Sequence, residues 1–546
     1  MKWYENAIFY HIYPLGLCGC PKENDGVTSQ NHFDQLNQWT DHIKELGCNA
    51  IYIGPLFESV AHGYDTIDYK LVDRRLGTNQ DFKEYVEHCH QLGIKVIVDG
   101  VFNHVGRRFF AFEDVKKNRQ QSQYCDWFCN VNFSGNNEYN DGFCYENWGG
   151  YNVLVKLNQR NPKVKEYLFD VVRYWIEEFK IDGIRLDAAD VLDHDFMQDL
   201  RKVTDSLKEN FWLMGEVIHG NYAQWANNQT LHSVTNYELH KALFSGHNDH
   251  NYFEIAHSVQ RMIDINGNNK LYTFVDNHDV ARIATKVTNK AHLIPIYILE
   301  FGLPGIPSIY YGSEFAIEGR KDQNGPDDDI RPELHLSDYA DAYKNNAVTQ
   351  LIRKLCIIHK ECAELTEGRY QQLQLTNRQF AFGRVLDDSA VIVALNNDDQ
   401  PAESWIRMPI RANQAVDLLK ADLEPVDDAK QAELEKEQKT AILEKCSSIN
   451  QKIYQNLSDL TDMTKKLERL ITSNASLDEI KEDSMAANQL WETTGQLYET
   501  LLNAQSLKPV HSQITASEDC DIRIEGDQLV VKLPANSGTM IRIYQE

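Results

Sequence analysis

The run Lys95-Val96-Ile97-Val98-Asp99 combines the two features that decide the fold: β-branched apolar residues, followed by an acid. Between runs of this kind, the apolar positions have helix-like spacing over ten or more residues, which is typical of parallel strands joined by crossover helices. Eight runs precede residue 360: Ile8–Ile12, Ala50–Ile53, Lys95–Asp99, Gly183–Asp187, Trp212–Glu216, Ser233–Asn236, Tyr272–Asp276 and Ser308–Tyr311. They predict an α/β protein with a closed (β/α)8 TIM barrel rather than an open sheet.

The alternation fails between Gly106 and Asn158, where glycine, asparagine and aromatic residues gather. A loop of that length inside a compact domain is usually a small inserted domain or a functional lid. We therefore predict an inserted domain at 106–158, after the third barrel strand, whose aromatic side chains mostly pack in its own core. The barrel is then divided into a first part, 1–105, and a second part, 159–365.

Beyond about residue 368 the pattern changes to alternating strands, at Phe380–Arg384, Ala390–Leu395, Leu529–Leu533 and Met540–Tyr544. These strands predict a C-terminal β-sandwich in two parts, 366–423 and 509–546, because a segment of another kind separates them.

That separating segment has the pattern of a helical hairpin, predicted at 424–508 and bracketed by Pro425 and Pro509. Val426–Lys508 contains no proline and one glycine, and its apolar residues have heptad-like, coiled-coil spacing. The pattern breaks at 472–476, and Ser476 with Glu479 forms a capping box that opens the second helix. The hairpin at 427–506 either stands alone, binds a second subunit or another protein as a homo-oligomer or partner contact, or covers the active site.

Composition restricts the class of protein. The 546 residues include 55 Lys and Arg against 81 Asp and Glu, a net charge of −26, which disfavours nucleic acid and membrane surfaces as partners. No basic segment followed by an apolar core opens the sequence, and the eleven cysteines have no regular spacing. We expect a cytoplasmic protein with reduced thiols. Cys125, Cys129 and Cys144 suggest zinc, but no second close pair completes such a site.

Acids and histidines stand where several predicted strands end. Asp99, Asp187, Glu216 and the run Asp276-Asn277-His278-Asp279 occupy these positions. In a (β/α)8 barrel the chemistry lies at the carboxyl ends of the strands. Clustered carboxylates shift each other's pKa values apart, as acid/base catalysis requires.

Four segments together resemble the ordered motifs of the α-amylase family, glycoside hydrolase family 13, of retaining glycosidases. They are Asp99-Gly100-Val101-Phe102-Asn103-His104, Gly183-Ile184-Arg185-Leu186-Asp187, Gly215-Glu216 and Phe274-Val275-Asp276-Asn277-His278-Asp279. The resemblance spans residues 1 to about 420 and resumes from about 510. It implies an O-glycosyl hydrolase that cleaves α-1,4 bonds of maltooligosaccharides, cyclodextrins or related α-glucans by double displacement.

The resemblance also implies roles for single residues. Asp187 matches the nucleophile, Glu216 the general acid/base and Asp279 the transition-state stabiliser. Five residues match substrate-binding positions: Tyr64, as a platform stacked on the sugar ring, and Asp99, His104, Arg185 and His278. Arg185 is expected to keep Asp187 ionised. No cofactor is required, although Asn103 matches a position that often binds Ca²⁺ at the junction of barrel and insert.

Within the family, Asp187-Ala188-Ala189-Asp190-Val191-Leu192-Asp193-His194 is similar to the motif of cyclomaltodextrinases, neopullulanases and maltogenic amylases. The chain departs from that group at Asp190-Val191, where Asn-Glu is usual, and we expect it to lack the N-terminal domain of the group. Two alternatives stay open: a transglycosylase or sugar isomerase on the same scaffold, and an amylase-like binding protein without activity.

Overall fold

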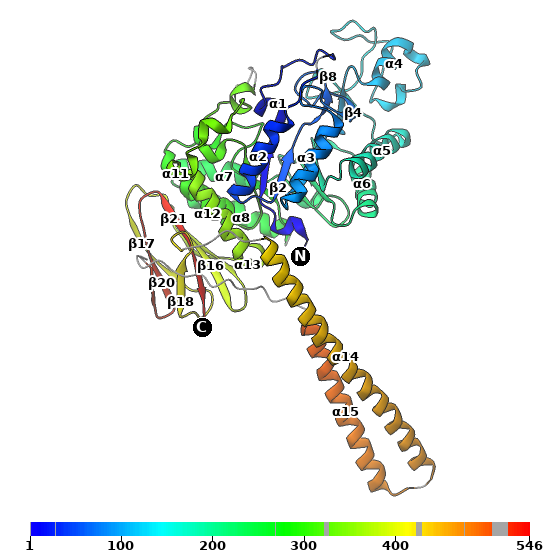
Figure 1. Ribbon diagram of the computed structural model, residues 1–546, viewed down its shortest axis with the longest axis vertical. Helices are drawn as coiled ribbons and strands as arrows, with labels where there is room; N and C mark the ends of the chain where they lie inside the picture. Colours follow the sequence, from blue (N-terminus) through cyan, green and yellow to red (C-terminus); the bar gives the residue numbers. More distant parts are fainter. Residues whose placement is uncertain are drawn as a thin grey trace. The chain divides into compact units, whose positions relative to one another are not determined.

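The computed structural model describes residues 2–27, 29–267, 269–321, 327–421, 428–473, 475–504 and 522–545. The chain divides into two compact units. The larger unit contains a parallel barrel, a small sheet inserted in it and two antiparallel sheets; the smaller unit consists of two long helices (Figure 1).

The predicted TIM barrel is confirmed. Its strands follow the spatial order β11-β10-β9-β5-β2-β1-β13-β12, with every pairing parallel. A bridge from Thr235 to Tyr272 brings the two ends of this order together. The eight strands match the eight predicted runs: β1 (Phe9–Ile12), β2 (Ala50–Ile53), β5 (Lys95–Gly100), β9 (Gly183–Leu186), β10 (Trp212–Gly215), β11 (Ser233–Val234), β12 (Tyr272–Phe274) and β13 (Ile306–Tyr310).

Helices surround the barrel, and several of them begin at a residue whose side chain caps the first turn. Thr78 and Asp81 form a capping box at the start of α3, and the Asn161 side chain caps α5 before Pro162. The main helices are α2 (Phe33–Leu46), α3 (Asn79–Gln91), α5 (Pro162–Glu178), α6 (His194–Leu207), α7 (Tyr237–Asn248), α8 (Tyr252–Asn266), α10 (Leu293–Gly302) and α12 (Ala347–Glu361). None of the helices within the described ranges combines the length and apolar character needed to cross a bilayer.

The segment after β5 forms a three-stranded sheet and a helix. The sheet has the order β6 (His104–Gly106), β8 (Tyr151–Lys156) and β7 (Asn147–Trp148), and α4 (Phe110–Asn118) follows β6. Phe109, Trp127 and Phe128 are buried, as expected of a local core. Trp148 and Tyr151 instead line a cavity shared with the barrel.

Two antiparallel sheets form the C-terminal part of the larger unit. One has the order β14 (Arg369–Leu375), β15 (Gln379–Val385), β16 (Ser389–Asn396), β21 (Ser537–Tyr544) and β18 (Gln414–Asp417); the other has the order β17 (Ala402–Arg407), β20 (Gln528–Leu533) and β19 (Ile522–Glu525). Alternate residues of both sheets share one apolar cluster, including Ile392, Ile406 and Val531. This contact between the sheets is what a sandwich requires.

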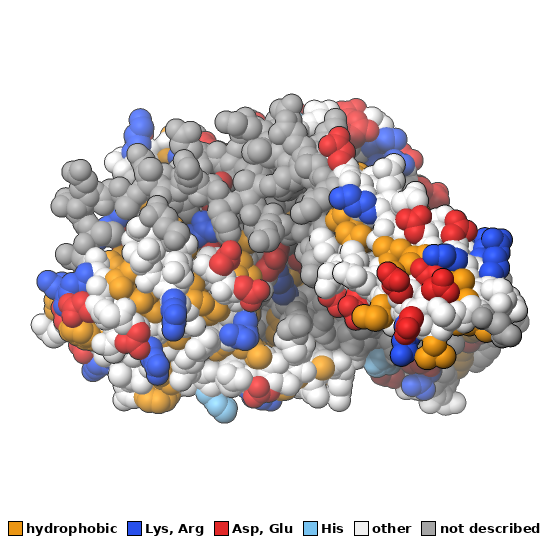
Figure 2. Space-filling view, turned by 90° about the horizontal axis from the view of Figure 1, so that it is seen from below, with side chains coloured by type: hydrophobic (Ala, Val, Ile, Leu, Met, Phe, Trp, Pro, Cys, Tyr) orange, Lys and Arg blue, Asp and Glu red, His pale blue; other side chains and the backbone are white. Residues whose placement is uncertain are grey.

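The smaller unit consists of α14 (Asp428–Thr472) and α15 (Leu477–Ala504), which pack side by side (Figure 1). The predicted capping box is confirmed: the Ser476 hydroxyl accepts from the Glu479 backbone N–H, and the Glu479 carboxylate accepts from the Ser476 backbone N–H. The limits predicted at 424 and 508, with Pro425 and Pro509, lie outside the described residues, and the other domain limits remain predictions. Figure 2 shows Lys and Arg side chains interspersed with Asp and Glu on the face that it draws.

Candidate active site

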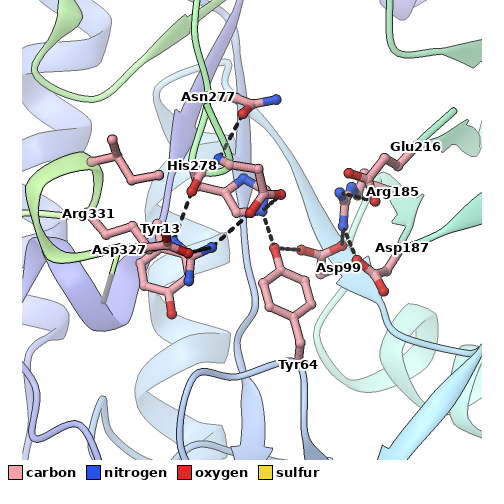
Figure 3. A network of polar contacts seen from close by, with 12 residues as sticks. Tyr13, Tyr64, Asp99, Arg185, Asp187, Glu216, Asn277, His278, Asp327 and Arg331 are labelled. Carbon is pink, nitrogen blue, oxygen red and sulfur yellow. Dashed lines mark hydrogen bonds and ion pairs between the residues drawn. The ribbon is translucent and has the colours of Figure 1, made fainter. Parts of the chain in front are cut away.

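A cavity of about 920 Å³ lies at the carboxyl ends of the barrel strands. Asp187 and Glu216 directly follow β9 and β10 and line it, as do Asp279, Tyr64 and His104. The other three predicted site residues, Asp99, Arg185 and His278, are 2% exposed. They contact the lining residues Tyr64, Asp187 and Asp279, respectively. The structure thus brings all eight predicted residues together at one end of the barrel. Figure 3 shows Tyr64, Asp99, Arg185, Asp187, Glu216 and His278 among them.

Arg185 connects the acids on one side of the cavity. Its Nη1 lies 2.8 Å from Asp99 Oδ1 and 2.9 Å from Asp187 Oδ1, and its Nη2 lies 2.9 Å from Glu216 Oε2. The arrangement follows from the strand, because residues two apart point to the same face. A single buried guanidinium therefore contacts three carboxylates from three neighbouring strands.

The pKa of Asp187 depends on its burial and on the charged groups around it. Burial raises the pKa of Asp187 well above its usual range, Arg185 opposes the rise, and Glu216 and Asp99 add to it. We expected Arg185 to keep Asp187 ionised, and the ion pair is present, but burial and the neighbouring carboxylates outweigh it. Asp187 consequently keeps its proton to a higher pH than an ordinary carboxyl group does.

The pKa of Asp279 is shifted in the opposite direction to that of Asp187. Burial alone would raise its pKa, but His278 and then Arg331 and Lys321 outweigh burial and hold the pKa well below the usual value. His278 Nε2 lies 2.8 Å from Asp279 Oδ2, and Arg331 Nη2 lies 2.8 Å from Oδ1. The backbone N–H of Asp279 also donates to Asn277 Oδ1 at 2.8 Å, which fixes the turn that presents the carboxylate.

Tyr64 lies between these two groups of charges (Figure 3). Its hydroxyl contacts His278 Nε2 and donates to Asp99 Oδ2 at 3.3 Å. The Tyr64 ring is stacked on the His278 ring, with the planes 14° apart. Tyr52 donates to the same Asp99 oxygen at 2.6 Å, so the position of Tyr64 is coupled to the buried end of the acid network.

His104 is neutral and has one nitrogen free. Burial, followed by the charge of His62, lowers the pKa of His104 to about 3. The amide of Asn103 donates to Nδ1 at 3.2 Å, which places the proton on Nε2. Nε2 has no hydrogen-bond partner and lies 4.0 Å from Asp187 Oδ2. It is therefore a donor available beside Asp187.

Three contacts in the site involve residues that the sequence analysis did not select. Arg331 pairs with Asp279, Tyr52 donates to Asp99, and the Tyr237 hydroxyl donates to Glu216 Oε1 at 3.4 Å. Tyr52 is in a predicted strand, and strand alternation was a signal that its side chain enters the barrel. Arg331 stands in an irregular segment with no periodic signal.

The structure does not build the metal sites that the sequence raised. Among the described residues, no three His, Cys, Asp or Glu side chains are arranged to hold a metal ion. Asn103 Oδ1 is buried without a partner, but calcium takes six to eight oxygen ligands. The described residues place no cluster of acids beside it, and we derive no step from calcium. The ten cysteines of the described ranges are free thiols.

Comparison with known proteins extends over most of the larger unit. Residues 33–357 match the family described as "Alpha amylase, catalytic domain". A cyclomaltodextrinase of Thermoanaerobacter pseudethanolicus is 32% identical over 431 residues, which cover 73% of this chain and 71% of the relative. An intracellular maltogenic amylase of Bacillus subtilis is 30% identical over 427 residues, 72% of this chain and 69% of the relative.

A similar fold is present among solved structures. The cyclic α-maltosyl-(1→6)-maltose hydrolase from Arthrobacter globiformis superimposes with a TM-score of 0.66 at 25% identity. That likeness covers 74% of this chain and 93% of the hydrolase.

Proposed function

The chain belongs to the α-amylase family of glycosidases, and from that premise we propose that it is a retaining hydrolase of α-1,4-linked glucans. The substrates proposed are maltooligosaccharides, cyclodextrins or related α-glucans, in keeping with the names of its relatives. The observation that carries the proposal is the contact of one Arg185 guanidinium with Asp187 and Glu216, because retaining hydrolysis needs two nearby carboxyl groups with different protonation.

In the first step Glu216 gives a proton to the glycosidic oxygen while an Asp187 oxygen attacks C1, and the leaving sugar departs. In the second step Glu216 takes a proton from water, the water oxygen bonds to C1, and Asp187 is released. The first step requires that, with the sugar bound, the proton is on Glu216 and Asp187 is ionised.

Asp279 has a different role in this proposal. The low pKa held by His278, Arg331 and Lys321 keeps its carboxylate ionised, so it stabilises the positive charge that develops on the sugar. His104 Nε2 and the ring of Tyr64 are proposed to bind the sugar between the catalytic acids. Trp148 and Tyr151 add aromatic surface to the same cavity, against which the apolar face of a pyranose packs.

Two further proposals concern the location of the protein in the cell and its protein partners. The free thiols of the described cysteines support a cytoplasmic location, as does the similarity to an intracellular maltogenic amylase of B. subtilis. The side chains of Tyr454, Trp491 and Tyr498 on the two long helices are 73%, 66% and 57% exposed, which supports a second copy of the chain or another protein as a partner there.

The experiment for the main proposal incubates the protein separately with maltotriose, β-cyclodextrin, pullulan, soluble starch and isomaltose, and separates the products by chromatography. Hydrolysis of maltotriose or β-cyclodextrin, with little action on isomaltose, is expected. NMR during the first minutes should show the α-anomer released first. Initial β-anomer would exclude double displacement, and products longer than the substrate would favour transglycosylation. If every substrate is left intact, the result would support the alternative of an amylase-like binding protein without activity.

A further inference from the structure

A second cavity, of about 770 Å³, lies at the opposite end of the barrel, where the strands begin. Trp212 and Ile306 are the first residues of β10 and β13, and both line it. Arg369 at the start of β14 and Arg384 on β15 form another part of its wall. The residues that line it are all different from those lining the active-site cavity.

The charge of this cavity is opposite to that of the chain. Five basic residues line it, against the two acids Glu5 and Glu367: Lys2, Arg201, Lys270, Arg369 and Arg384. The whole chain carries a net charge of −26. A concave surface with an excess of positive charge attracts anions and concentrates their field within its low-dielectric walls.

Arg384 is the most informative of these residues. Its side chain is 3% exposed, and its Nε and Nη1 donate to the carbonyl oxygens of Gly368 and Gly302 at 3.1 and 3.2 Å. No carboxylate in the described part of the chain forms an ion pair with it, whereas the buried Arg542 lies 2.8 Å from Glu364. Burial lowers the pKa of Arg384 to about 10. A buried charge is normally paired, and since no described carboxylate pairs with this one, an anionic ligand is a suitable partner.

Two neighbouring donors, Lys270 and Trp212, also lack a carboxylate partner or an acceptor among the described residues. Lys270 Nζ donates to the carbonyl oxygen of Glu5, and no ion pair with a carboxylate is found for it within the described ranges. Burial, and then the charge of Arg384, lowers the pKa of Lys270 to about 8. The indole N–H of Trp212 is buried without an acceptor. An anion in the cavity would give Arg384 and Lys270 a counter-charge.

We propose that this cavity binds a small organic phosphate, with the phosphate group between Arg384, Lys270 and Arg369. Guanidinium groups hold phosphate oxygens by paired, charge-assisted hydrogen bonds, and lysine adds a point charge. The volume is within the range of small-molecule sites and much exceeds what inorganic phosphate fills. The aromatic residues Tyr4, Trp212 and Tyr370 line the remainder, so the site takes a phosphate ester with a sugar or nucleoside body.

The test measures binding of glucose 6-phosphate, AMP and inorganic phosphate to the full-length protein by calorimetry at low salt, with saturating maltose to occupy the active site. At least one ester should bind more tightly than inorganic phosphate. Arg369→Ala and Lys270→Met should each weaken that ester by about tenfold, the equivalent of losing one charge-assisted contact. Arg411→Ala, which removes an exposed arginine elsewhere in the same sheet domain, should leave the affinity unchanged.

Hydrolysis of maltotriose provides the folding control, because neither Arg369 nor Lys270 contacts the active-site cavity. Esters that bind equally to the protein and to both folded variants would overturn the proposal, as would the absence of any binding. If inorganic phosphate binds as tightly as the esters, the sugar or nucleoside body contributes nothing to affinity, and the proposal of an organic phosphate is overturned. Glucose 6-phosphate bound more tightly than AMP identifies a sugar phosphate, and the reverse order identifies a nucleotide.

Discussion

Arg331 Nη2 lies 2.8 Å from Asp279 Oδ1, although 52 positions separate the two residues in the chain. The Nε of the same guanidinium donates to the carbonyl oxygen of His278 at 2.9 Å, and the group lies over the ring of Tyr13. These contacts fix the cation beside the carboxylate. Arg331 is consequently a residue through which the ionisation of Asp279 can be changed without changing Asp279 itself.

Replacing Arg331 with Met should move the acidic limb of the pH–rate profile to higher pH. The cation lowers the pKa of Asp279, so without it Asp279 keeps its proton up to a higher pH and the active, ionised form is lost earlier as the pH falls. The profile of kcat/KM for maltotriose measures this. Arg320→Met, an exposed arginine outside the described contacts of Asp279, should leave the limb in place. An unshifted limb in Arg331→Met would show that Asp279 does not depend on Arg331.

The three proposed catalytic acids should each be indispensable. Asp187→Asn, Glu216→Gln and Asp279→Asn are expected to lower kcat by several orders of magnitude, since each removes a charge or proton used in the transition state. Circular dichroism and thermal unfolding should show a fold close to the original. Asp205→Asn, on the exposed face of α6, is the matched control and should stay within a few-fold. Substantial turnover in any of the three would remove that residue from the mechanism.

Arg185 should be important for stability as well as activity. Arg185→Met leaves three buried carboxyl groups without their shared cation, which is expected to lower the free energy of unfolding by about 3–5 kcal/mol at neutral pH. Urea denaturation measures this change. Adding Asp99→Asn should recover part of the loss, because one buried acid is then neutral. Strictly additive destabilisation would indicate that Arg185 and Asp99 act independently, against the 2.8 Å contact.

Ser476→Ala should destabilise the start of α15 by about 1 kcal/mol, the usual effect of removing a helix N-cap. Amide hydrogen exchange measured in the full chain should become faster over the first turns of this helix. Ser473→Ala is the matched control, since Ser473 bonds to the carbonyl oxygen of Leu470 and caps no helix start. Equal exchange in both variants would mean that the capping box contributes nothing to the turn between the helices.

Deleting 427–506 and rejoining the ends with a short Gly-Ser linker should leave maltotriose turnover within a few-fold. The active-site cavity is built from residues of the larger unit, so the chemistry needs no part of the two long helices. A change in sedimentation mass alone would identify the helices as an assembly device. Loss of activity in a shortened protein that remains folded would instead support a lid over the site.

The barrel and its acids were predictable because they depend on local patterns. A run such as Lys95–Gly100 must be a buried strand, and an acid at its end must face the mouth of the barrel. Arg331 was not predictable, because its position depends on an irregular segment and not on a periodic one. Arg185 pairs with Asp187 as expected, but burial, with Glu216 and Asp99, raises the pKa of Asp187, and burial is known only from the three-dimensional arrangement.

The position of β21 affects the order in which the chain can fold during synthesis. β21 is an inner strand, between β16 and β18, yet the two long helices separate β18 from it in the chain. At usual translation rates, the 120 positions from Asp417 to Ser537 take roughly 6–24 s to make. During that interval β16 and β18 expose unpaired edges, while the helices need only each other and can form at once. The nascent protein therefore has a period of several seconds in which chaperone binding, or a slower ribosome, would most affect its yield.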